Sequence, residues 1–259
     1  MGGTLNKVIN IKMRNTINKL QSKFKAFIPQ HIKNTTVMTA YDLMRRYGNT
    51  ISEKRIMQNA ALNAKELHGG HTDYFTGTIK YIENQSQWEK IRFGKGKNCT
   101  MSHSGCGIIA AYNAMAALNK QVSPEVMVEL IGSFERDGAA LGGRFGVAPS
   151  AIYDYFVRNG YEAVITKEKN VDEINRIGES YDVVIVTAYN DEMDITAMIH
   201  TVCITKAEDG AYVIHNGYHR DADSGRWDEK RTGKYTLAEA ISQIGKKSAA
   251  IIVIGINRR

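Results

Sequence analysis

The sequence contains little cysteine, and its apolar runs are short. Only three of the 259 residues are cysteine, with no CxxC pair, so neither a disulfide framework nor a zinc cluster is indicated. The longest apolar runs, such as AAIIVIGI at 249–256, are far too short to cross a bilayer. Residues 1–28 carry basic residues throughout and no clean apolar block, so we expect no secretory signal peptide and a cytoplasmic location.

The chain also lacks internal repeats and low-complexity tracts. Its hydrophobic fraction of 43% and charged fraction of 24% are ordinary for a globular protein. A length of 259 residues is enough for one large domain, or for one domain with an extension.

Acidic residues are scarce near the N-terminus. Residues 1–60 hold eleven lysines and arginines against only Asp42 and Glu53, a net charge of +9, which leaves −2 of the total +7 for the rest. Within this region, apolar residues recur at three- and four-residue steps over 5–28, with lysine and arginine between them. This pattern predicts a basic amphipathic helix that Pro29 ends.

Helical patterns dominate the first half of the chain and strand patterns the second, an order that indicates an α+β fold with a mostly antiparallel sheet. After residue 28 we predict helices at about 39–47, 52–67, 106–118, 123–134, 148–160, 171–177 and 235–245. We predict strands at 161–166, 182–189, 199–206, 211–216 and 249–257. An Asp-Gly pair joins the strands at 199–206 and 211–216 as a hairpin.

One cysteine lies between two glycines, at the point where a helix is predicted to begin. In SHSGCGIIAAYNAMAALNK, residues 102–120, small and apolar residues follow Cys106 at helical spacing, and a polar, turn-prone run precedes it. Unpaired backbone N–H groups at a helix N-terminus stabilise a thiolate. We therefore expect Cys106 to be a reactive thiol with a lowered pKa, although a cysteine packed in the core is the structural alternative.

A thiol nucleophile needs a base, and the base needs a group that holds its ring. Of seven histidines, His200 is the best candidate, because it opens a strand and the hairpin brings Asn216 opposite that region. Period-two alternation places His215 on the face opposite Asn216, and Cys203 on the face opposite His200. His103 is expected to be a loop histidine.

GCGIIAAYNAMAAL resembles the nucleophile helix of papain-like cysteine peptidases. In particular, it resembles the bacterial branch related to bacteriocin-leader-processing (double-glycine) peptidases. HTVCITKAEDGAYVIHN is similar to that branch's histidine strand, hairpin and Asp/Asn strand, and the likeness covers about 94 to the C-terminus. The resemblance implies a papain-like catalytic domain at 91–259, preceded by a basic helical extension at 1–90.

The resemblance also implies the roles of the site residues. Cys106 is the nucleophile, His200 the general base and then acid, and Asn216 the residue that orients the imidazole. The branch typically has a glutamine a few residues before the cysteine, whose amide stabilises the oxyanion. No glutamine stands there, and the candidates that replace it are Asn98, Thr100 and Ser102.

These roles predict a cysteine peptidase that forms an acyl-thioester on a peptide or protein substrate, with no cofactor and no metal. Two alternatives stay open: another thiol acyl transferase or deamidase on the same triad, and a catalytically inactive papain-like binding module. A zinc site from Cys99, His103 and Cys106 lacks a fourth ligand. We expect Cys99 and Cys203 to take no part in the chemistry.

The basic segment 5–28 has three interpretations. It packs as a helix with a solvated basic face, docks on its own catalytic domain as inhibitory pro-segments of papain-like enzymes do, or makes weak contact with an anionic membrane surface. No aromatic-interleaved basic surface or nucleic-acid motif accompanies it, so nucleic acid is not an expected partner. The sequence does not predict an oligomeric state.

Overall fold

The computed structural model describes residues 30–69, 81–96, 99–119, 123–167, 170–189, 199–220, 222–223, 225, 228–244 and 250–258. The helix predicted at 5–28 and the oxyanion candidate Asn98 lie outside these described residues.

The helices largely follow the sequence pattern. They are α2 (Gln30–Arg46), α3 (Glu53–His68), α4 (Met101–Ser104), α5 (Cys106–Asn119), α6 (Pro124–Asp137), α7 (Pro149–Arg158), α8 (Val171–Ser180) and α9 (Leu237–Ile241), with 3₁₀ turns η1 (Gln85–Gln87) and η2 (Ala140–Gly143). Helix α6 begins as predicted, because the Ser123 side chain accepts from the Val126 N–H and Pro124 occupies the first turn. Helix α2 begins nine residues before its predicted start, and α9 is shorter than predicted.

Within the described residues the strands form one sheet of six. They are β1 (Glu162–Thr166), β2 (Val183–Tyr189), β3 (Ile199–Lys206), β4 (Tyr212–His215), β5 (Lys230–Arg231) and β6 (Ala250–Asn257), in the order β1-β6-β2-β3-β4-β5. Every neighbouring pair is antiparallel. This confirms the predicted α+β class and the β3–β4 hairpin, whose turn places Gly210 at a φ of +84°.

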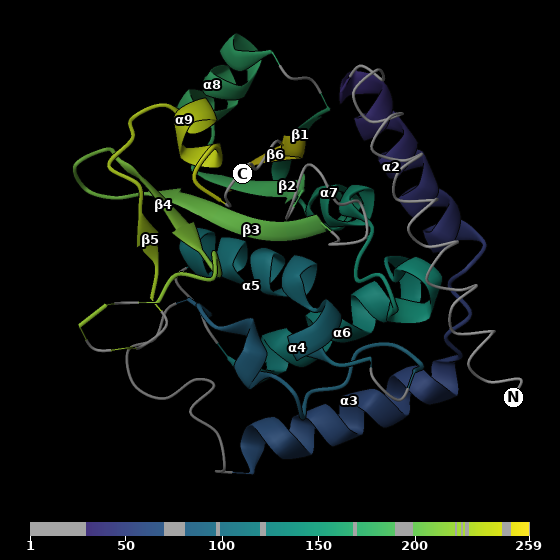
Figure 1. Ribbon diagram of the computed structural model, residues 1–259. Coiled ribbons are helices and arrows are strands. Elements are labelled where there is room, and N and C mark those ends of the chain that lie inside the picture. The colour runs from purple at the N-terminus through teal and green to yellow at the C-terminus, as the bar shows by residue number, and fades with distance from the viewer. Residues whose placement is uncertain are drawn as a thin grey trace, which may run out of the picture.

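Helices cover both faces of the sheet (Figure 1). Helices α8 and α9 pack on one face, where Ile177 and Leu237 meet Val202 and Ile204. Helix α5 runs along the other face, with α6 beneath it, and here the core includes Ile109 and Cys203. Strand β2 is buried along its whole length, as expected for a central strand with helices on both sides.

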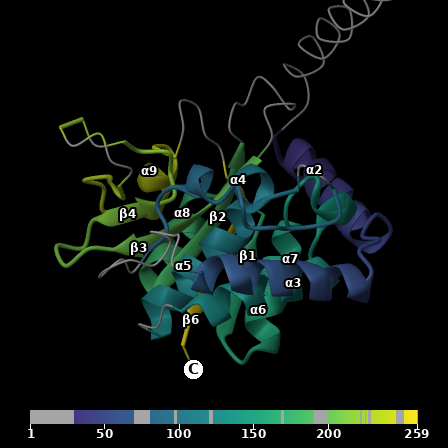
Figure 2. The same cartoon turned by 90° about the horizontal axis from the view of Figure 1, so that it is seen from below.

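The described residues before position 90 share this core. Tyr41 from α2 and Leu67 from α3 belong to the same buried cluster as Trp88, Met101 and Ile109. Helix α3 lies alongside α6 (Figure 2). The boundary expected at residues 90/91 therefore does not separate two hydrophobic cores.

None of the described helices is long and apolar enough to cross a membrane.

Candidate active site

Cys106 is the first residue of helix α5, as the sequence predicts. Helix α4 ends at Ser104 and is capped by Gly105, whose N–H donates to the Met101 carbonyl at 2.9 Å. A Cβ on Gly105 would lie 2.4 Å from that same oxygen, and one on Gly107 would lie 3.1 Å from the Val147 side chain. Gly105 therefore allows the tight corner between α4 and α5, and Gly107 allows the start of α5 to pack closely against Val147.

The thiol and the predicted base open onto the same cleft. This cleft has a volume of about 160 Å³, and Gln85, Cys106, His200, Thr201 and Tyr218 are among its lining residues. Cys106 is half-buried there, and His200 is only 3% exposed. Two larger hollows, of about 460 and 500 Å³, contain neither cysteine nor histidine. The smaller cleft is therefore the candidate active site.

The His200 ring is held in one orientation. Its Nε2 lies 2.7 Å from the backbone carbonyl oxygen of Asn216, and the Tyr218 ring stacks on it with centroids 4.3 Å apart. A carbonyl oxygen only accepts hydrogen bonds, so Nε2 carries the proton of the neutral ring. Nδ1 is then the basic nitrogen and can accept a proton.

Asn216 contacts the imidazole through its backbone and not through its side chain. Strand β4 ends one residue earlier, and Asn216 has a φ of +58°, which turns its carbonyl toward His200. The side chain instead binds Gln85: Oδ1 accepts from the Gln85 N–H at 3.1 Å, and Nδ2 donates to Gln85 Oε1 at 3.3 Å. The expected contact between the side-chain amide and the ring is thus replaced by a backbone contact.

The expectation of a lowered thiol pKa is wrong. Burial raises the pKa of the Cys106 thiol, and hydrogen bonds from the backbone and side chain of Thr201 offset this only in part. Burial also lowers the pKa of His200 to about 4, against a smaller raising effect of the Asn216 carbonyl. Desolvation therefore outweighs the helix N-terminus, and thiol and imidazole are both neutral at pH 7.

Gln85 and Tyr218 are cleft residues that the sequence analysis does not predict, and Gln85 carries an amide. Its side-chain Nε2 donates to the Ser102 carbonyl at 3.0 Å, which leaves a second amide hydrogen for another acceptor. Gln85 lies 21 positions before Cys106, much farther than the few residues at which the resembled branch has its glutamine. The predicted oxyanion residues Thr100 and Ser102 contact each other at 3.4 Å and are not among the residues that line the cleft.

The two strand residues Cys203 and His215 lie as strand alternation predicts. Cys203 is fully buried in the cluster on the α5 side of the sheet, whereas its neighbours in β3 face α8 and α9, so its predicted orientation is confirmed. His215 pairs with Cys203 across the ladder and does not line the cleft. His103 lies in helix α4 and not in the expected loop, and it is exposed at the cleft rim.

The metal alternative finds no support at Cys106. Within the described part of the chain, the group with metal-like spacing is Glu83, His215 and Glu229, and it includes none of Cys99, His103 and Cys106.

No family model, curated protein or solved structure matches this chain. Its function is therefore inferred from the chemistry of the cleft.

Proposed function

We propose that the chain is a papain-like cysteine peptidase in which Cys106 is the nucleophile and His200 the general base. One observation carries this proposal: a thiol at a helix start and an imidazole with a basic Nδ1 line one cleft, although 94 residues separate them in the sequence. A nucleophile, a base and a group that holds the base are the minimum set for acyl transfer.

In the proposed reaction, the sulfur of Cys106 attacks the carbonyl carbon of a substrate amide while His200 Nδ1 takes the thiol proton. The C–S bond forms, and the carbonyl oxygen becomes an oxyanion. The backbone N–H of Cys106, at the start of α5, and the second amide hydrogen of Gln85 are the donors available to it. The intermediate then collapses, the C–N bond breaks, and His200 gives its proton to the leaving amine.

The acyl-thioester is hydrolysed by the same groups in reverse. Nδ1 of His200 removes a proton from water, and the resulting hydroxide attacks the thioester carbon. The C–S bond breaks, the carboxylic acid leaves, and the proton returns to the sulfur. Because both groups are neutral at rest, the thiol proton has to pass to His200 before or while the sulfur attacks.

The test is cleavage of a mixed-sequence peptide library by the full chain, read by mass spectrometry. Cys106→Ala and His200→Ala are each expected to lower cleavage by about 10³-fold or more. The controls Cys203→Ala and His219→Ala remove a thiol buried in the core and an exposed imidazole that is not among the residues lining the cleft. Cleavage that survives Cys106→Ala would overturn the proposal.

The same experiment separates the related chemistries. Adding a primary amine to the reaction would produce amide-linked adducts if the chain transfers acyl groups instead of hydrolysing them. Conversion of glutamine to glutamate without backbone cleavage would identify a deamidase. The absence of both products and of any covalent adduct on Cys106 would indicate a binding module.

A further inference from the structure

Residues 82–85, which we call the clamp segment, hydrogen-bond to both halves of the proposed catalytic site. At one end, the Ile82 N–H donates to Asn113 Oδ1 at 2.8 Å, and Asn113 Nδ2 donates back to the Ile82 carbonyl at 3.0 Å. Asn113 is a fully buried residue of α5, the helix that begins with Cys106. The clamp segment is therefore fixed to the cysteine helix by a reciprocal pair of buried hydrogen bonds.

At the other end, the clamp segment holds the residue that orients the imidazole. Glu83 Oε2 accepts from the Asn216 N–H at 2.8 Å, and its other oxygen, Oε1, lies 2.6 Å from His215 Nδ1. The Gln85 N–H donates to Asn216 Oδ1 at 3.1 Å. Hydrogen bonds to an ionised carboxylate are stronger than neutral ones, so Glu83 makes the dominant contact.

We propose that Glu83 is a positioning residue for His200. Two hydrogen bonds connect them in series: the Asn216 N–H donates to Glu83, and His200 Nε2–H donates to the Asn216 carbonyl. A third, from His215 Nδ1–H, holds the Glu83 carboxylate from the other side. The positive φ of Asn216 is unfavourable for a residue with a side chain and persists only where surrounding contacts hold it. This inference rests on the proposed function, since it assigns His200 as the base.

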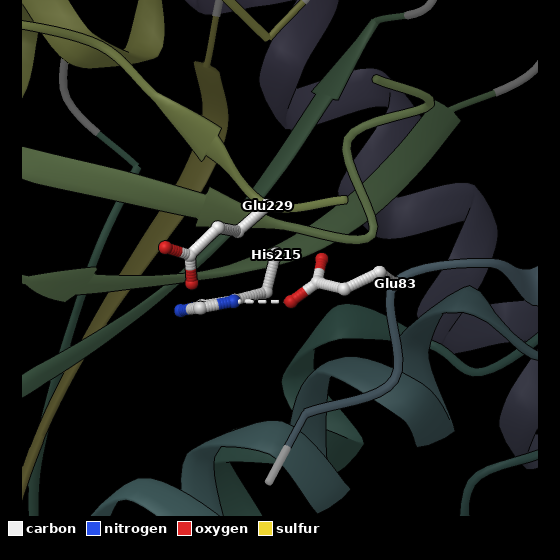
Figure 3. Close-up of side chains that lie close together, drawn as sticks. All are labelled: Glu83, His215 and Glu229. Carbon is white, nitrogen blue, oxygen red and sulfur yellow. Dashed lines mark hydrogen bonds and ion pairs between the residues drawn. The ribbon is translucent and has the colours of Figure 1, made fainter. Parts of the chain in front are cut away.

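The cluster around His215 also has the donor set of a divalent-cation site. Figure 3 shows Glu83, His215 and Glu229 turned toward one another. The candidate ligand atoms of these three residues all lie within 4.8 Å of one another. However, both ring nitrogens of His215 already have protein partners, Glu83 and Thr205 Oγ1, the latter at 2.8 Å. Glu229 forms an ion pair with Arg231 at 2.8 Å. These protein partners satisfy the groups of the cluster without an ion.

Glu229 provides a matched control, because it belongs to the cluster but has no hydrogen bond to Asn216. In Glu83→Gln, one carboxylate oxygen is replaced by an NH₂ group, which cannot accept a hydrogen bond. Either the Asn216 N–H or His215 Nδ1–H therefore loses its acceptor. We expect the His200 ring, observed in a two-bond ¹H–¹⁵N NMR spectrum, to lose its uniform Nε2–H tautomer. We expect kcat for peptide cleavage to fall ten- to a hundred-fold with KM little changed, and both readouts to stay unchanged in Glu229→Gln.

Glu83→Asp gives an intermediate variant if Glu83→Gln does not fold, because the shorter carboxylate keeps its charge and reaches only one of the two donors. An unchanged tautomer in the Glu83 variants would overturn the proposal. Equal losses in Glu83→Gln and Glu229→Gln, reproduced in the unmodified chain by EDTA, would overturn it in favour of a metal site. The tautomer is measured without substrate, so it tests Glu83 even if peptide cleavage is never observed.

Discussion

At the scale of single residues, the backbone carbonyl of Asn216 contacts the His200 ring, whereas the sequence analysis expects its side-chain amide to do so. Asn216→Gly keeps the carbonyl that contacts His200 Nε2 and favours the observed φ of +58°. It removes only the two side-chain bonds to Gln85. We therefore expect peptide cleavage to fall by about ten-fold or less, measured as kcat/KM.

An orienting role of the side-chain amide predicts a different result for the same variant. Loss of the group that orients a catalytic imidazole costs about 10⁴-fold in a well-studied serine enzyme. A comparable loss in Asn216→Gly, with an unchanged thermal melt, would refute the backbone assignment.

If His200 is the base of the proposed peptidase, its pKa sets the acid limit of peptide cleavage. Burial lowers it from 6.5 to about 4, so Nδ1 is available as a base down to that pH. We expect kcat/KM to fall below about pH 4, and a limb near pH 6.5 would contradict the buried, neutral ring. The measurement is a rate profile from pH 3 to 8, with circular dichroism at each pH to exclude unfolding.

The same shift links His200 to stability. His200 has a pKa of 6.5 in the unfolded chain and of about 4 in the folded chain, so the unfolded chain binds more protons between these values. The free energy of unfolding therefore decreases as the pH falls from 6.5 to 4.

At the scale of elements, Glu135 joins α6 to α3 and to the loop before α4. Its Oε1 accepts from Asn59 Nδ2 at 2.5 Å and from the Gly94 N–H at 2.6 Å. Its Oε2 and Asn59 Oδ1 are buried and have no hydrogen-bond partner among the described residues. Burial, partly offset by these hydrogen bonds, raises the pKa of Glu135 from 4.5 to about 7.

A raised carboxyl pKa means that the folded state favours the protonated form. The protonated Glu135 carboxyl therefore contributes to the free energy of unfolding below pH 4.5, and this contribution is lost as the pH rises to about 7. Glu135→Gln has no charge to bury, and its amide can donate to Asn59 Oδ1. At pH 8 we expect this variant to exceed the unmodified chain in free energy of unfolding by up to about 3 kcal/mol, measured by urea denaturation.

The gain should shrink as the pH falls toward 5, where Glu135 is protonated in the folded state. Glu129→Gln, on the exposed side of the same helix, is the control and should change little at either pH. Destabilisation by Glu135→Gln at pH 8 would contradict the raised pKa.

The elements also show which features local sequence could predict. Ser123 and Pro124 mark the start of α6, because capping is a local interaction. The start of α2 is predicted nine residues too late, because residues 30–38 are mostly polar and show no clear apolar period. Strand β5 has only two residues and forms by pairing with β4, so no local pattern predicts it.

In the candidate site, too, the residues with local sequence signals were predicted and those with long-range contacts were not. Cys106 and His200 were predicted from a helix start and a strand start, which are local signals. Glu83 and Gln85 were not, because their contacts with Asn216 span more than 130 positions. The sign of the Cys106 pKa shift was missed because burial is produced by distant segments, whereas the helix N-terminus is visible in the sequence.

At the scale of the whole molecule, the shared core makes a prediction about dividing the chain. A fragment that begins at residue 91 lacks Tyr41, Leu67, Ile82 and Trp88, all of which are buried in the main cluster. Each such side chain contributes about 1.5–3 kcal/mol on burial, and together they approach the usual net stability of about 5–15 kcal/mol. The fragment also lacks Glu83 and Gln85, which hold Asn216.

We therefore expect the 91–259 fragment to show no cooperative thermal unfolding and poor dispersion in a ¹H–¹⁵N NMR spectrum. A chain that begins at residue 30 keeps every described core residue, so it serves as the control and should unfold cooperatively. Cooperative unfolding of the 91–259 fragment at the melting temperature of the full chain would mean that residues 30–90 are dispensable for the fold. In that case the hydrogen bonds from the clamp segment to Asn113 and Asn216 would not be required for the fold.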